Sequence, residues 1–188
     1  MPAEHVLKYT GQKSYTLEVS GLRRELPLIS VGNGTWIAFF ESLGDVELIN
    51  KSAQALSKEL GECEILMTSE SKGISLLQQI GTILGHKTFI VCRKERKGYM
   101  REPLSVRYKP ITSPNEKELF LDSNLAALLK GKKVGIVDDV VSTRATLDAM
   151  AVLAQKAGGI VVKKAVILAE GSEQEDVISL GILPIFKK

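Results

Sequence analysis

The sequence predicts an α/β domain with a mostly parallel sheet and helices on both faces. From Asp45 onward, apolar positions alternate between strand-like and helix-like spacing, which gives repeated β-α-β units. A length of 188 residues suits one sizeable core, and 44% hydrophobic with 25% charged residues is typical of a globular protein. In such sheets, ligands bind beyond the carboxyl ends of the strands, so functional residues are expected there.

The first unit should hold two helices that each end at a glycine, with a short apolar strand after each. These elements are a helix from Asp45 to Gly61, a strand at 65–67, a helix from Gly73 to Gly85 and a strand at 89–91. The second unit should hold one helix between strands. Its elements are a strand at 134–137, a helix from Thr146 to Ala157, and strands at 160–162 and 166–169.

Two segments lie outside these units. Residues 93–125 are charged and interrupted by three prolines, so we expect a long excursion with at most a loose hairpin. Residues 1–44 contain one alternating strand at 15–19 and short apolar, aromatic pieces. We therefore expect a small N-terminal hood, 1–44, over one end of a core domain, 45–188.

Composition argues against several classes of protein. Cys63 and Cys92 stand singly beside apolar runs and are expected to be buried hydrophobic side chains rather than metal ligands or a disulfide. The two histidines, His5 and His86, occupy poor positions for a catalytic triad or zinc site. No apolar run approaches the ~18 residues of a membrane span, and the start does not resemble a secretory signal. We expect a cytoplasmic protein without a membrane partner.

Positive charge is concentrated in the excursion. Between Arg93 and Lys109 there are seven basic and two acidic residues. A solvated loop and a phosphate-rich ligand both explain this charge. Nucleic acid is not expected as a partner, because Tyr99 and Tyr108 are the only aromatic residues there.

The segment from Val134 to Thr146 has the clearest chemical pattern. An apolar strand ends in Asp138 and Asp139, whose side chains should point to opposite faces of the sheet. A hydroxyl-rich turn then opens a helix, and its free backbone N–H groups would form a seat for an anion such as a phosphate monoester. The alternative is that these polar residues only cap and turn the chain.

This pattern resembles the diphosphate-sugar signature of type I phosphoribosyltransferases: four apolar residues, two acids, two apolar residues and a Thr-Gly-Gly-Thr-like turn. Three other segments resemble the adenine enzymes of that family. They are Glu70-Ser71-Lys72-Gly73, like the Glu-Ala-Arg-Gly loop; Arg93-Lys94, like a basic pair before a flexible catalytic loop; and Ala165 to Glu170, like a late strand. The resemblance covers the chain from about Asp45 and implies the Rossmann-like fold of that family.

The resemblance also implies an activity. A purine base, most closely adenine, would displace pyrophosphate from 5-phosphoribosyl-1-diphosphate to give a nucleoside monophosphate. This glycosyltransferase reaction belongs to purine salvage in nucleotide metabolism, requires Mg²⁺ and is carried out by homodimers. One subunit of such a dimer can extend Arg93 or Lys94 into its partner's site.

The same resemblance assigns roles to residues of this chain. The assignments are Asp138 and Asp139 on the ribose side as catalytic residues; Ser142, Thr143, Arg144, Ala145 and Thr146 at the 5-phosphate; Ser71, Lys72, Arg93 and Lys94 at pyrophosphate; and Phe39 and Phe40 at the base. Mg²⁺ would be held mainly by the substrate, with Asp138 or Asp139 as the candidate protein ligand.

The chain departs from the family pattern in three ways. Arg144 replaces the first glycine of the turn, Lys72 replaces an arginine, and the excursion shows no counterpart of the acidic residue of the flexible loop. We expect the Arg144 side chain to add charge at the phosphate; the alternative is that it obstructs the site, where glycine would let the backbone approach the phosphate. The departures leave an alternative function, a non-catalytic regulatory module that binds the diphosphate sugar.

Overall fold

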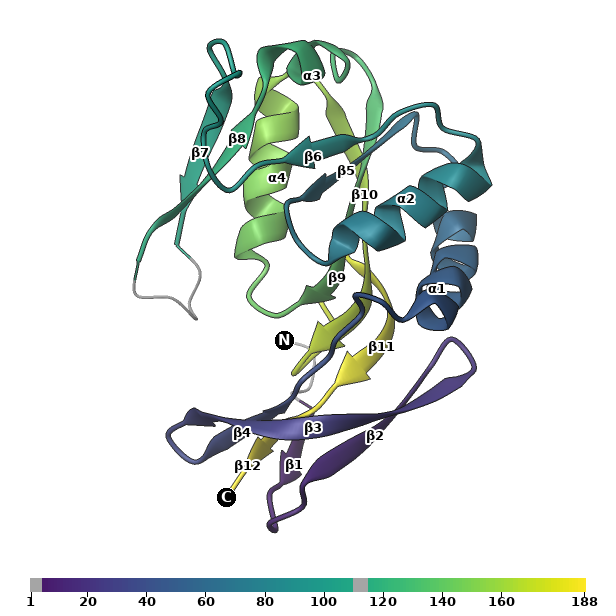
Figure 1. The fold of residues 1–188 in the computed structure, drawn as a ribbon, viewed down its shortest axis with the longest axis vertical. Coiled ribbons are helices and arrows are strands. Elements are labelled where there is room, and N and C mark those ends of the chain that lie inside the picture. The colour runs from purple at the N-terminus through teal and green to yellow at the C-terminus, as the bar shows by residue number, and fades with distance from the viewer. Residues whose placement is uncertain (1–4, 110–114) are drawn as a thin grey trace.

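The computed structural model describes residues 5–109 and 115–188, which form a core sheet, an N-terminal sheet and a two-stranded hairpin (Figure 1). All neighbouring strands of the core sheet are parallel, and the order is β11-β10-β9-β5-β6. The strands are β5 (Ile65–Ser69), β6 (Ile90–Cys92), β9 (Lys133–Val141), β10 (Ile160–Glu170) and β11 (Ile178–Leu183).

Helices cover both faces of this sheet, as predicted. One face packs on α1 (Val46–Glu59) and α2 (Gly73–Leu84), and the other on α4 (Ala145–Lys156) and the short α3 (Ser123–Ala127) (Figure 1). Each face has its own cluster of buried apolar side chains. No helix within the described ranges is long and apolar enough to cross a membrane.

The predicted helices begin and end close to the observed bounds, whereas the strands differ more. Strand β9 continues through both aspartates to Val141, and β10 is one strand rather than the two expected. It stays continuous because it pairs with β9 from Ile160 to Ala169 and with β11 from Ala165 onward, and a register shift between Val161 and Lys163 absorbs the irregularity.

The excursion after β6 is more regular than predicted. It forms an antiparallel hairpin of β7 (Leu104–Tyr108) and β8 (Lys117–Leu121), whose residues pair along the full length of both strands. The hairpin packs on the α4 side of the core, where the Lys156 ammonium donates to the carbonyl oxygen of Ser105. Part of the loop that was compared with a flexible catalytic loop, residues 110–114, lies outside the described residues.

The N-terminal sheet has the strand order β1-β12-β4-β3-β2. Its strands are β1 (Val6–Lys8), β2 (Ser14–Val19), β3 (Leu22–Gly32), β4 (Thr35–Ala38) and β12 (Ile185–Lys187). The sheet is therefore not built from residues 1–44 alone, because the C-terminal strand β12 pairs with both β1 and β4. The domain boundary at residue 45 stays a prediction.

An ion pair ties the N-terminal sheet to the start of the core. Arg24 of β3 donates from Nε to Asp45 Oδ2 at 2.7 Å, and Asp45 Oδ1 accepts from the backbone N–H of Leu48 at 3.0 Å. Asp45 is thus both the predicted cap of α1 and the anchor of the hood. The Arg24 guanidinium lowers the pKa of the Asp45 carboxyl, so the ionised form stabilises the fold.

Replacing this carboxylate should destabilise the protein at neutral pH. We expect Asp45→Ala to lower the free energy of unfolding by about 1–2 kcal/mol, because it removes a helix cap and a partly buried ion pair. Urea unfolding measures this loss. Glu47→Gln is the matched control, since Glu47 pairs with the same Arg24 but its side chain is 61% exposed. Similar losses in both variants would contradict this role for Asp45.

Candidate active site at the carboxyl ends of the core strands

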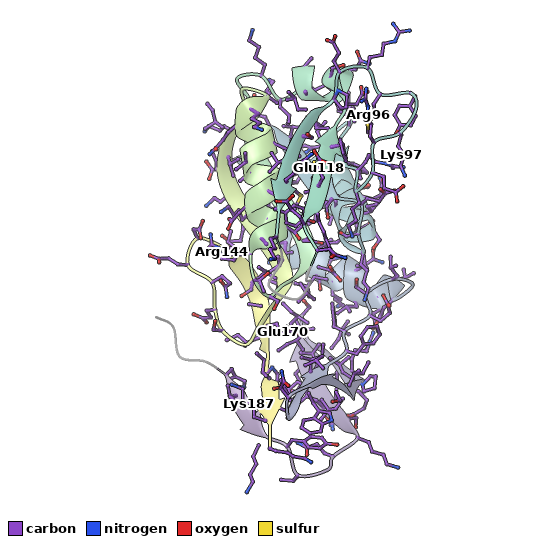
Figure 2. The ribbon with its side chains drawn as sticks, turned by 90° about the vertical axis from the view of Figure 1, so that its left-hand side faces the viewer. Arg96, Lys97, Glu118, Arg144, Glu170 and Lys187 are labelled. Atoms are coloured by element: carbon purple, nitrogen blue, oxygen red, sulfur yellow. The ribbon has the colours of Figure 1, made fainter. Side chains whose placement is uncertain are left out.

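A cavity of about 370 Å³ lies between the carboxyl ends of the core strands and the N-terminal sheet. Strands β5 and β10 end at it with Ser69 and Glu170, and β9 contributes Asp138 and Asp139 from its carboxyl-terminal half. The hood contributes residues 37–40 to the opposite wall. The position agrees with the expected ligand site of a parallel sheet. Figure 2 shows Glu170 in this region, above the N-terminal sheet.

Two buried carboxylates form the floor of the cavity. Asp138 Oδ1 accepts from the Ser71 hydroxyl at 2.9 Å and from the backbone N–H of Asp139 at 3.0 Å, and Asp139 Oδ2 accepts from Ser42 at 3.3 Å. Neither carboxylate has an ion pair among the described residues. Burial, and then the charge of Asp139, raise the pKa of the Asp138 carboxyl to about 7.

The start of α2 is packed tightly against this acid pair. A Cβ atom on Gly73 would lie 2.8 Å from Asp138 Oδ1 and 3.1 Å from Asp138 Cα. Only glycine therefore lets the helix approach so closely. The backbone N–H of Gly73 donates to the Ser71 hydroxyl at 3.2 Å, which completes a chain of hydrogen bonds to Asp138.

The expectation that the aspartates serve opposite faces needs correction. Successive side chains do alternate on β9, but the pairing of β9 with β5 stops at Ile136 and Met67, before the two aspartates. Both side chains therefore reach the lining of the same cavity. The pair is able to meet one ligand from two sides.

A second cavity, of about 170 Å³, lies at the start of α4. It is lined by the whole hydroxyl-rich turn, Ser142, Thr143, Arg144, Ala145 and Thr146. No side chain caps α4, so its first backbone N–H groups are available to an anion. Asp138, Val140 and Thr146 line both cavities, which are therefore adjacent.

Two side chains of the turn, those of Ser142 and Arg144, form contacts with neighbouring residues instead of extending free into this cavity as predicted. The Ser142 hydroxyl donates to Glu170 Oε1 at 2.9 Å. The Arg144 guanidinium is turned away and donates to the carbonyl oxygen of Glu175 at 2.7 Å. It also pairs with Asp176 at 2.6 Å. The structure thus offers the backbone of residue 144 to a phosphate, and does not support the expected contact from its side chain.

The predicted pyrophosphate residues divide into two groups. Ser71, Lys72 and Lys94 line the larger cavity. Arg93 is instead held 3.2 Å from Glu70, and its backbone pairs with Phe120 of the hairpin. Arg93 lines neither of the two cavities in this structure.

Lys72 joins the α2 loop to the hood. Its ammonium donates to the carbonyl oxygen of Phe40 at 2.9 Å, lies 3.2 Å from Glu41 and stands 4.7 Å from the ring centroid of Phe39. The predicted pyrophosphate ligand therefore fixes the segment that carries the predicted base residues.

The two predicted base residues are not equivalent. Both line the cavity, but Phe39 is 40% exposed, whereas Phe40 is 5% exposed and packs in the core. Trp36, which lies close by in the hood, stacks on Tyr9 with ring centroids 3.8 Å apart. Phe39 is therefore the aromatic side chain of this group that is placed to meet a planar ligand.

Sequence reasoning missed several residues at the two cavities or beside them, including Glu170, Lys117 and Ser42. Glu170 ends β10, and the rule that ligands bind at carboxyl strand ends could have identified it. Lys117 lines the smaller cavity from the hairpin, and Ser42 reaches Asp139 from the hood. Neither carries a local signal, since both positions depend on packing between distant segments.

Comparisons with known proteins agree with this geometry. The profile of the phosphoribosyl transferase domain matches residues 44–180. The adenine phosphoribosyltransferase of Mannheimia succiniciproducens is 31% identical over 147 residues, 77% of this chain and 74% of that protein. The hypoxanthine/guanine phosphoribosyltransferase of Methanocella paludicola is 25% identical over 158 residues, 80% of this chain and 78% of that protein.

A solved structure shows the same fold. The adenine phosphoribosyltransferase of Thermoanaerobacter pseudethanolicus superposes with a TM-score of 0.60 at 25% identity, covering 74% of this chain and 83% of that one. Its match confirms the predicted α/β architecture. With the profile spanning the core strands, the acid pair and the turn before α4, the chain belongs to the phosphoribosyltransferase family.

Proposed function

We propose that this protein transfers the phosphoribosyl group of 5-phosphoribosyl-1-diphosphate to a purine base, with adenine as the preferred acceptor. The observation that carries the proposal is the pair of adjacent cavities that share Asp138, Val140 and Thr146. The smaller cavity is lined by the turn before α4, whose backbone N–H groups can bind a phosphate. The larger cavity is lined by carboxylates, cations and an aromatic ring.

This arrangement suggests how the substrates would lie. The 5-phosphate would occupy the turn at 142–146, and the ribose hydroxyls would face Asp138 and Asp139. Lys72 and Lys94 would meet the diphosphate, and Phe39 would stack on the base. A base nitrogen then forms a bond to the anomeric carbon as the bond from that carbon to the diphosphate oxygen breaks. The protein contributes by positioning the partners and stabilising the departing charge.

The acid pair also fits a role beside Mg²⁺. Asp138 and Asp139 offer oxygen ligands and form no ion pair with a basic side chain among the described residues, and the nearby hydroxyl of Ser69 is buried without a hydrogen-bond partner. The described residues contain no cluster of three or more side chains able to hold a metal ion. We propose that the metal ion is held mainly by the substrate, where it would neutralise the negative charge of the diphosphate.

The relatives favour an enzyme of purine salvage over a regulatory module. Those reported above are named as transferases, and two of the three act on adenine by name. The third is named for hypoxanthine and guanine, so these bases are the competing acceptors. A cytoplasmic location and a homodimer remain part of the proposal.

A base panel tests the function directly. With Mg²⁺ and the diphosphate sugar, pyrophosphate release should have a kcat/KM for adenine at least about tenfold above that for hypoxanthine or guanine. Replacing both Asp138 and Asp139 by alanine should abolish release and leave a folded protein. Sugar binding without turnover of any base would support the regulatory module, and absence of sugar binding would contradict both functions.

Lys117 should strengthen phosphate binding. We expect Lys117→Gln to raise the KM for the diphosphate sugar about tenfold, because a charge-assisted contact contributes roughly 1.5 kcal/mol. Arg107→Gln is the matched control, since it removes one positive charge from the same hairpin at a side chain that is 71% exposed and 3.6 Å from Glu118. Steady-state kinetics should show less than a twofold change for the control. A similar rise in both variants would indicate only a general effect of charge.

The ionised Asp138 carboxylate should destabilise the folded protein at high pH, although it is needed for ligand binding. Its raised pKa means that ionisation in the folded state costs stability, and the cost grows from about pH 4 to about pH 7. The free energy of unfolding of Asp138→Asn, measured relative to the parent in urea, should therefore increase by on the order of 2 kcal/mol from pH 5 to pH 8. The same variant should lose sugar binding in calorimetry. A stability difference independent of pH would refute this account.

A further inference from the structure

Arg144 occupies a backbone conformation that arginine rarely adopts. Its φ is 62° and its ψ is −15°, in the left-handed region that favours glycine. The residue stands directly before α4, in the middle of the turn that lines the smaller cavity. Something outside the turn must hold an arginine in this conformation.

The connection between β10 and β11 supplies the contacts. Besides the carbonyl oxygen of Glu175, the Arg144 guanidinium contacts Asp176 Oδ1 at 2.6 Å, and Asp148 lies 3.7 Å from its other terminal nitrogen. The second oxygen of Asp176 is 2.9 Å from the ammonium of Lys164. Asp176 thus bridges two cations, and the Lys164 side chain, 13% exposed, is anchored in the core sheet.

The backbone of the connection is also in an unusual conformation at Asp176, the residue that contacts Arg144. Asp176 also has a positive φ, of 65°, which aspartate tolerates better than most residues. The same connection starts at Glu170, which accepts from Ser142. The turn before α4 is therefore held at both ends by one neighbouring segment. Figure 2 shows Arg144 beside that segment.

We propose that Asp176 is a positioning residue for the 5-phosphate: by holding the Arg144 guanidinium, it keeps residue 144 in the left-handed conformation that directs the backbone N–H groups of the turn at the phosphate. The inference rests on the proposed function, because it assigns the phosphate to this turn. On this account, arginine at position 144 can take the conformation of a glycine only with a contact from Asp176. Glycine would reach the same conformation alone.

A double-mutant cycle tests this dependence. Ribose 5-phosphate is the probe, and its Kd is measured by calorimetry for the parent, Asp176→Ala, Arg144→Gly and the double variant. We expect Asp176→Ala to raise the Kd about fivefold and Arg144→Gly to change it less than twofold. In the double variant the loss should be absent, because glycine no longer needs the contact. With the diphosphate sugar and adenine, Asp176→Ala should raise KM and leave kcat unchanged.

A variant in the same connection serves as the control for the loss of negative charge. Glu173→Ala removes one negative charge from an exposed residue that has no ion pair in the described part of the chain, and should leave the Kd unchanged. Tighter binding by Asp176→Ala would overturn the proposal, since it would mean that a released Arg144 contacts the phosphate itself. An equal loss in the parent and in the Arg144→Gly background would also overturn it.

Hydrogen exchange separates this inference from the proposed function. Without ligand, Asp176→Ala should speed amide exchange at residues 142–146, and Arg144→Gly should cancel that increase. Unchanged exchange in Asp176→Ala would overturn the positioning role even if the enzyme is active. A parent protein that binds neither ribose 5-phosphate nor the diphosphate sugar would contradict the proposed function, and with it the assignment of the phosphate to this turn.

Discussion

The burial of two adjacent carboxylates at the end of β9 is the constraint on which the site depends. An unpaired buried charge is costly, and neither Asp138 nor Asp139 has a basic partner among the described residues. Their partners are the hydroxyls of Ser71 and Ser42 and one backbone N–H. Two helix starts without side-chain caps, those of α2 and α4, flank the pair and provide partial positive charge. Such an arrangement stores unfavourable electrostatic energy that a bound diol or cation would relieve.

The fold brings these groups together by sheet order rather than by chain order. Strand β9 is central in the core sheet, so its carboxyl end lies between β5 and β10. The loop after β5 supplies Ser71 and Gly73, and the end of β10 supplies Glu170. The hood closes the opposite side, and Lys72 ties it to α2 through Phe40. The proposed phosphate, ribose and base sites thereby lie in series along one edge of the sheet.

Local signals made much of this architecture predictable. Asp45 caps α1, Gly85 ends α2 in the left-handed conformation, and the pattern from Val134 to Thr146 lies where a strand passes into a helix. Features that depend on distant segments were not predictable. Lys117 lines the smaller cavity because of the register of a hairpin, and β12 returns to the N-terminal sheet from the other end of the chain. The side-chain direction of Arg144 depends on a carboxylate 32 positions away, at Asp176.

The case of Arg144 bears on how departures from a family pattern are interpreted. Taken alone, an arginine in place of a glycine indicates either a new phosphate ligand or an obstructed site. In the structure the guanidinium is engaged by Asp176 and by the carbonyl oxygen of Glu175, and the backbone keeps a glycine-like conformation. The substitution therefore preserves the shape of the turn through a second residue, rather than changing its chemistry. Loss of the glycine is consequently no argument for loss of activity, and the regulatory alternative loses one of the departures on which it was based.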